Sequence, residues 1–208
     1  MKQFLTLFVM ASVITVSAQN ISLPEPRKTG GKPLMEALND RQSSRSFSDR
    51  ELDLQTLSNL LWAAWGINRP EDKKRTAPTS RNFQEMEVFI SLPSGLYLYD
   101  AMDNRLVKIH DRDIRANTGL QDFVAKAPLN LIYVANQEKV QDPHGERQLK
   151  ASHTNSGFMA QNVYLFCASE GLVSVVRAWF DEDDLHQAMG LGENMKIILA
   201  QTVGYPAD

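Results

Sequence analysis

A short segment near the start of the chain places two arginines and a serine at alternate positions, Arg41, Ser43 and Arg45. In an extended backbone, alternate side chains lie on the same side. Each guanidinium can donate two hydrogen bonds to a phosphate, and the serine hydroxyl adds a further donor. The spacing therefore predicts a site for one dianionic phosphate. The alternative is solvated surface, which is the usual environment of arginine- and serine-rich turns.

A second polar pair, Asn82 and Gln84, lies in a turn that leads into an alternating strand pattern. Carboxamides can both donate and accept hydrogen bonds. The segment 175–181 follows much later and contains Arg177, Ala178 and Trp179. Residue types alone give this later segment no chemical role.

The elements that must position these residues can be read from hydrophobic periodicity and from turn residues. Helices are predicted over residues 34–38, 54–65, 146–170 and 183–189, with Asp53 as a cap and with Gly66, Gly171 and Gly190 as ends. Strands are predicted over 87–92, 97–99, 106–109, 129–134 and 197–202. Strands grouped before a long helix, with one strand returning at the end, indicate an α+β fold. Trp62 and Trp65 lie on or beside the apolar face of helix 54–65, where they form core or subunit contacts or stack on a ring cofactor.

The order of the segments 41–47, 77–84, 157–165, 175–181 and 203–206 resembles that of the nitroreductase family of FMN flavoproteins. The resemblance covers roughly residues 33–206 and is closest to the SagB/thiazole-oxazole oxidase branch. It implies a nitroreductase-like fold, with a central, mostly antiparallel sheet flanked by helices, in a domain-intertwined homodimer. It also implies two FMN sites at the subunit interface.

The resemblance also assigns roles within the FMN site. The phosphate would be bound by Arg41, Ser43 and Arg45, the flavin ring would be contacted by Asn82 and Gln84, and backbone amides would approach N5 in the stretch that contains Arg177, Ala178 and Trp179. No catalytic side chain is required, because the flavin carries out the redox step. The expected activity is transfer of hydride or electrons to or from a small organic substrate, with NAD(P)H or another electron donor.

The two ends of the chain suggest export and raise an alternative function. Residues 1–18 have the layout of a cleavable signal peptide, residues 19–32 are expected to be an exposed leader, and residues 33–208 a single domain. The protein is therefore expected in the periplasm or secreted. Many family members continue into a Lys/Arg pair that completes the phosphate site, whereas this sequence ends at Asp208. The alternative is an exported, non-catalytic flavin- or ligand-binding module on the same fold.

The composition argues against several other classes of function. With 22 basic and 25 acidic residues, the net charge of −3 argues against nucleic acid as a partner. No apolar run reaches the roughly 20 residues of a membrane span. The single cysteine, Cys167, is expected to be buried and structural. Asp142, His144 and Glu146 offer only one histidine in a Pro/Gly turn, so no metal site is predicted.

Overall fold

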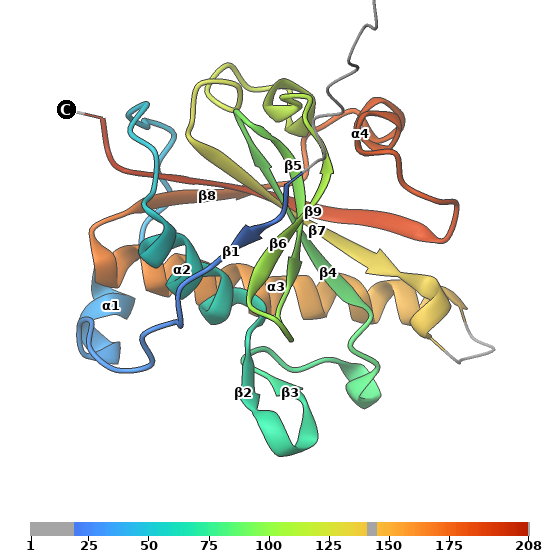
Figure 1. The fold of residues 1–208 in the computed structure, drawn as a ribbon, viewed down its shortest axis with the longest axis horizontal. Coiled ribbons are helices and arrows are strands. Elements are labelled where there is room, and N and C mark those ends of the chain that lie inside the picture. Colours follow the sequence, from blue (N-terminus) through green and yellow to red (C-terminus); the bar gives the residue numbers. More distant parts are fainter. Residues whose placement is uncertain (1–18, 141–144, 208) are drawn as a thin grey trace, which may run out of the picture.

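The computed structural model describes residues 19–140 and 145–207, and it contains a seven-stranded sheet in the order β1-β6-β5-β4-β7-β9-β8 (Figure 1). Every neighbouring pair in this sheet is antiparallel. The strands are β1 (Ile21–Ser22), β4 (Met86–Leu92), β5 (Gly95–Asp100), β6 (Arg105–His110), β7 (Leu129–Asn136), β8 (Val173–Arg177) and β9 (Met195–Gly204). A separate hairpin joins β2 (Ile67–Arg69) and β3 (Lys74–Arg75). The predicted α+β fold with an antiparallel sheet is confirmed.

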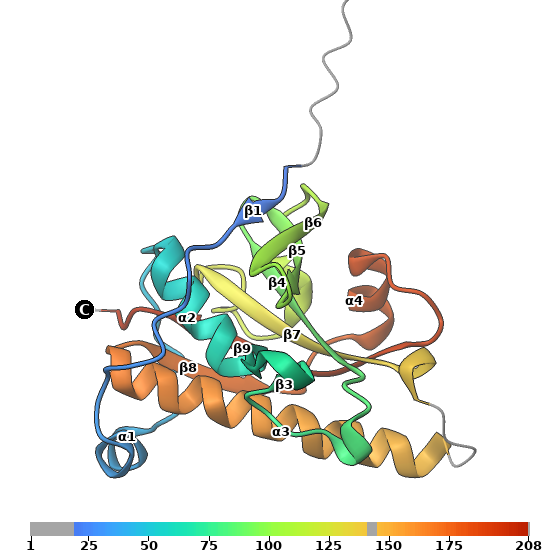
Figure 2. The ribbon, with the colours of Figure 1, turned by 60° about the horizontal axis from the view of Figure 1, so that its bottom comes forward.

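Helices cover both faces of the sheet. They are α1 (Leu34–Asp40), α2 (Leu54–Trp65), α3 (Gly145–Glu170) and α4 (Glu182–Met189). The long helix α3 runs along one face with α1 and α2 packed against it, and α4 lies on the opposite face (Figure 2). All four predicted helices are present.

The core has two layers because the central strands are buried on both faces. Along β4 and β7, Ile90 and Leu131 pack toward α2 and α3, whereas their neighbours Phe89 and Ile132 pack toward α4. Successive side chains in a strand point to opposite faces, so a strand covered on both sides needs a nearly continuous apolar sequence. This explains the uninterrupted burial from Leu129 to Ala135.

The helix ends follow the predicted capping residues. The Asp53 carboxylate accepts a hydrogen bond from the Thr56 N–H at 2.9 Å at the start of α2. Gly171 and Gly190 have φ angles of +70° and +68° at the ends of α3 and α4, a conformation that favours glycine. Cys167 is buried in α3, as predicted, and burial raises the pKa of its thiol.

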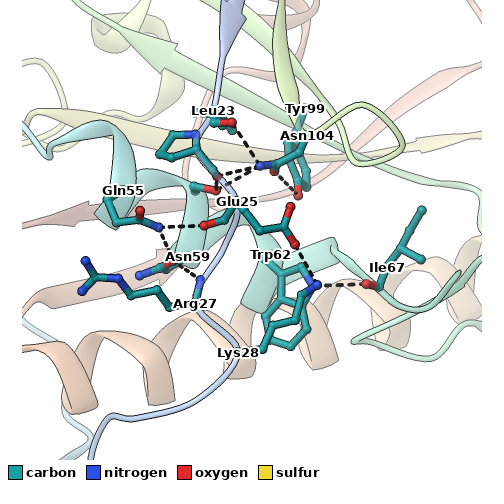
Figure 3. Close-up of polar contacts among 12 residues, drawn as sticks. Leu23, Glu25, Arg27, Lys28, Gln55, Asn59, Trp62, Ile67, Tyr99 and Asn104 are labelled. Atoms are coloured by element: carbon teal, nitrogen blue, oxygen red, sulfur yellow. Dashed lines mark hydrogen bonds and ion pairs between the residues drawn. The ribbon is translucent and has the colours of Figure 1, made fainter.

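The segment 19–32 forms a strap across α2 (Figure 3). Most of its side chains are exposed, but Leu23 is buried and β1 pairs with β6 at the edge of the sheet. Asn104 Nδ2 donates to the Pro24 carbonyl at 2.8 Å, and Asn59 Oδ1 accepts from the Arg27 N–H at 2.8 Å. The strap is therefore attached to the domain at several points.

Some features predicted from the sequence lie outside the described residues. The proposed signal peptide, residues 1–18, is one of them, and Asp142 and His144 are others. Within residues 19–140 and 145–207, no helix combines the length and apolar character needed to cross a bilayer. The same residues contain no cluster of three or more side chains suited to bind a metal ion.

Candidate functional site

The predicted phosphate-binding segment lies alongside β8, against the second half of α3. Ser43 forms a parallel bridge with Ser174 of β8, and the Ser44 N–H donates to the Ser174 carbonyl at 3.0 Å. The Ser43 Oγ lies 2.8 Å from the Tyr164 Oη of α3, and the Arg41 Cζ lies 5.4 Å from the centre of the Tyr164 ring. Arg41 and Ser43 are thus brought to the same aromatic side chain.

This segment carries positive charge that no acidic side chain neutralises within the described part of the chain. Neither Arg41 nor Arg45 forms an ion pair there. The adjacent Asp40 accepts a hydrogen bond from Lys32 Nζ at 2.6 Å, and this bond lowers the pKa of the Asp40 carboxyl. Arg41 and the exposed Ser43, together with the exposed Arg45 two residues further along the chain, therefore offer donors suited to a dianionic phosphate.

A cavity of about 290 Å³ opens beside the segment, and Gln42, Tyr164, Cys167 and Pro206 are among its lining residues. A larger cavity of about 630 Å³ lies between α1, α2 and α3, and neither cavity is lined by any of the predicted site residues. The chemistry of the site residues, rather than cavity size, therefore indicates where an anionic ligand would bind.

The side chain of Arg177, at the end of β8, points into the interior. It is 6% exposed, and its guanidinium donates to Asn130 Oδ1 at 2.5 Å, to Thr202 Oγ1 at 2.8 Å and to the carbonyl and hydroxyl of Thr118. All of these acceptors are neutral. Burial lowers the pKa of Arg177 to about 10, so the group stays charged at neutral pH. The Arg177 side chain therefore fixes β8 to β7, β9 and the loop before β7.

The two residues after Arg177 lie at the surface. Ala178 is exposed, and the Trp179 side chain is 63% exposed. The Trp179 carbonyl accepts from the Leu120 N–H at 3.1 Å, which anchors the backbone of this segment. Ala178 and Trp179 therefore come immediately after the buried Arg177 in the sequence and are accessible to a ligand.

The carboxamide pair lies in a strained turn before β4. Arg81, Asn82 and Gln84 have φ angles of 51°, 55° and 49°, a region that non-glycine residues seldom adopt. The Gln84 Oε1 accepts from Arg75 Nε at 2.9 Å, and its Nε2 donates to the Lys73 carbonyl at 3.1 Å. Strained backbone that is held by several contacts is typical of binding sites.

A residue that the sequence analysis did not identify, Glu85, fixes this turn to the first half of α3. Glu85 is fully buried, and its Oε1 accepts from Ser152 Oγ at 3.0 Å and from Asn155 Nδ2 at 2.7 Å. Burial of a carboxyl requires such partners. Because the partners lie 67 and 70 residues away in sequence, no local pattern identifies Glu85 as buried.

One chain does not bring the two groups of predicted site residues together. Glu85, beside the carboxamide turn, contacts Ser152, whereas Ser43 contacts Tyr164. At 1.5 Å per residue these contact points are about 18 Å apart along α3. Strands β4 and β8 are separated by β7 and β9, which puts them about 14 Å apart across the sheet. The phosphate-binding segment and the end of β8 form one group, and Asn82 and Gln84 form another.

The model of the nitroreductase family matches residues 38–205 of this chain. The chain belongs to the nitroreductase family. Members of this family are generally flavin-dependent oxidoreductases that use small substrates and NAD(P)H. The finding agrees with the order of motifs and with the antiparallel sheet between two helical layers.

Individual relatives support this assignment. The crystal structure of a nitroreductase-like protein from Ralstonia eutropha JMP134 is 42% identical, with a TM-score of 0.88 over 98% of this chain and 96% of that one. A nitroreductase-like protein of Methanocaldococcus jannaschii, MJ1384, is 29% identical over 170 residues, which cover 77% of this chain and 85% of that protein. A Desulfovibrio desulfuricans structure in complex with FMN shares the fold, with a TM-score of 0.62, 19% identity and coverage of 86% and 89%.

Proposed function

We propose that this protein is an FMN-dependent oxidoreductase that transfers hydride or electrons to or from a small organic substrate. One observation carries the proposal: Arg41 and Arg45, which flank Ser43 in the sequence, have no ion pair with an acidic side chain among the described residues, and the chain belongs to a generally flavin-dependent family. The FMN complex of the Desulfovibrio desulfuricans relative supports the choice of cofactor. The proposal also includes membership of the SagB-like branch, export to the periplasm or secretion, and NAD(P)H or another compound as the electron donor.

Each group of residues has a distinct task in this proposal. Arg41, Ser43 and Arg45 bind the phosphate, and the exposed backbone at Ala178 and Trp179 contacts the ring. FMN supplies the redox chemistry at N5, and the surrounding residues orient it and exclude water. No protein nucleophile takes part.

We further propose that Asn82 and Gln84 reach the flavin from a second copy of the chain. Two α3 helices that pack antiparallel would bring the carboxamide turn of one copy near the phosphate-binding segment of the other. Large apolar side chains on α1 and α3 support such packing, since Met35 is 75% exposed and Phe158 44% exposed. A homodimer with two composite FMN sites would follow.

The first test measures FMN binding by the protein without residues 1–18. Wild-type protein should turn yellow with FMN, and Arg41→Ala and Arg45→Ala should each weaken binding about 10- to 100-fold, because each removes a charge-assisted hydrogen bond. Arg50→Ala is the matched control, since the Arg50 guanidinium lies 3.9 Å from the Tyr205 ring and has no role in the proposed site. Wild-type protein that stays colourless refutes the enzyme proposal.

A mixing experiment tests the composite site. Arg41→Ala/Arg45→Ala protein and Asn82→Ala/Gln84→Ala protein should each bind FMN poorly. If each site combines two chains, refolding an equal mixture creates heterodimers in which one site carries all the changes and the other carries none. FMN binding should then partly return. If each site lies within one chain, every site stays defective and the mixture gains nothing.

Turnover separates the oxidoreductase from the non-catalytic module. The FMN-loaded protein should be reduced by NAD(P)H or by a chemical donor such as dithionite and should pass the electrons to nitroaromatic or quinone acceptors. Bound flavin that no donor and acceptor pair turns over would instead favour the ligand-binding module.

A further inference from the structure

Tyr164 connects the phosphate-binding segment to β8 through its hydroxyl. The Tyr164 side chain is 8% exposed, and its Oη accepts a hydrogen bond from the Val176 N–H at 2.8 Å. The same oxygen lies 2.8 Å from Ser43 Oγ. The chain of contacts thus runs from the backbone of β8 through a buried phenol to an exposed serine hydroxyl.

The direction of the second hydrogen bond follows from the available donors. The Tyr164 hydroxyl has a single proton, and Ser43 is the one acceptor for it among the described residues. Either oxygen could donate in this bond, and donation from Tyr164 to Ser43 is the arrangement that gives the Tyr164 proton a partner among the described residues. The proton of Ser43 is then free to point away from Tyr164, toward solvent or a ligand.

We propose that Tyr164 is a positioning residue that orients the Ser43 hydroxyl as a donor to the phosphate of FMN, an inference that rests on the function proposed above. Consecutive hydrogen bonds polarise one another. The bond from the Val176 N–H therefore makes the Tyr164 hydroxyl a stronger donor, and the bond from Tyr164 makes the Ser43 hydroxyl a stronger donor in turn. The Tyr164 ring also lies beside the Arg41 guanidinium, within the distance of a cation–π contact. One side chain therefore arranges two of the three phosphate-binding groups.

This role predicts selectivity between two flavins. FMN and riboflavin share the ring and differ in the phosphate, so a residue that acts through Ser43 affects FMN alone. A residue that merely supports the fold affects both ligands. The ratio of FMN affinity to riboflavin affinity is therefore the informative quantity.

The test titrates Tyr164→Phe protein with FMN and with riboflavin. The substitution keeps the ring beside Arg41 and removes the oxygen. FMN affinity should fall roughly three- to tenfold, the effect of one neutral hydrogen bond, while riboflavin affinity stays unchanged. Tyr205→Phe is the matched control, because the Tyr205 hydroxyl has no hydrogen bond to a described residue.

A double-mutant cycle with Ser43→Ala completes the test. If Tyr164 acts through Ser43, Tyr164→Phe weakens FMN binding in the wild-type background and has no further effect once Ser43 is alanine. Equal weakening in both backgrounds, or equal loss of riboflavin and FMN, overturns the proposal and leaves the proposed function intact. Should Tyr164→Phe not fold, Ser43→Ala alone decides, since an unchanged ratio of FMN to riboflavin affinity overturns it. Wild-type protein that binds no flavin overturns both proposals.

Discussion

Replacing Arg177 by methionine removes the guanidinium that links β8 to its neighbours while keeping a long, flexible apolar side chain. The change deprives four buried acceptor atoms of a donor: the carbonyl and hydroxyl oxygens of Thr118, Asn130 Oδ1 and Thr202 Oγ1. The position is 6% exposed, so solvent cannot replace the lost donors without a rearrangement. We expect a large loss of folding stability.

The size of the stability loss depends on which hydrogen bonds each acceptor atom retains. Hydrogen bonds to a charged group contribute about 1.5–3 kcal/mol each. The Thr202 hydroxyl still donates to Asn130 Oδ1 at 2.6 Å and the Thr118 hydroxyl still donates to the Arg115 carbonyl, so of the four atoms only the Thr118 carbonyl is left without any hydrogen bond to a described residue. Methionine also removes the desolvation cost that lowers the pKa of Arg177. The free energy of unfolding should therefore fall by about 3 kcal/mol, at the lower end of the range for breaking a buried polar pair.

Urea denaturation of the apo protein measures this loss. Arg112→Met is the matched control, because the exposed Arg112 guanidinium donates one bond of 2.9 Å to the Ala188 carbonyl and should contribute less than about 1 kcal/mol. Burial lowers the folded-state pKa of Arg177 to about 10, below its usual value, so the folded state releases this proton before the unfolded state does and gains stability only above about pH 10. The difference between wild type and Arg177→Met should therefore be constant from pH 6 to 9. A loss below about 1 kcal/mol would contradict the structural role of the guanidinium.

Four further substitutions test the fold. Gly119→Ala should lower the free energy of unfolding, measured in urea, by about 1–3 kcal/mol, because a Cβ there would lie 2.7 Å from the buried Arg177 guanidinium. Gly157→Ala is its control and should be neutral or stabilising, because a Cβ at that position would have no atom within 4 Å. Asp53→Ala should lower the free energy of unfolding by about 1 kcal/mol at pH 7, because α2 loses its cap. Hydrogen bonding from the Thr56 backbone lowers the pKa of Asp53. In thermal melts recorded down to pH 2, the stability difference between wild type and Asp53→Ala should therefore vanish as the pH falls through that lowered pKa. Asn104→Gly keeps the positive φ of 44° but removes the hydrogen bonds to the strap, so trypsin should cut faster at Arg27.

Local patterns in the sequence predicted much of the fold. Asp53 and Gly66 bracket a helix in the structure because capping and termination depend on neighbouring residues alone. The predicted strands were found with longer bounds, since backbone pairing continues beyond the apolar residues. By contrast, β1 and the hairpin β2–β3 are two or three residues long, too short for periodicity to detect. Strand β8 was not assigned from the sequence. Its five residues, Val-Ser-Val-Val-Arg, alternate only weakly between buried and half-buried positions, so they give little periodic signal.

The site was less accessible to sequence reasoning because its supporting contacts join distant residues. Alternation predicted that Arg41 and Ser43 share a side, and both lie beside Tyr164, but no sequence pattern points to Tyr164 itself. The inward position of Arg177 depends on Asn130 and Thr202, which are 47 and 25 residues away. An arginine within an apolar strand offers no local sign of whether its acceptors are protein or ligand.

The geometry of the chain supports the proposal that two copies would share each flavin site. Both groups of predicted ligands are anchored to α3, one through Glu85 and one through Ser43, and a rigid helix keeps these anchors about 18 Å apart. Closing this gap within one chain would require breaking either the buried contacts of Glu85 or the bridge between Ser43 and β8. In the proposed dimer, a second antiparallel α3 would close it without breaking either. The same anchors that separate the groups within one chain would therefore hold them in register across a dimer.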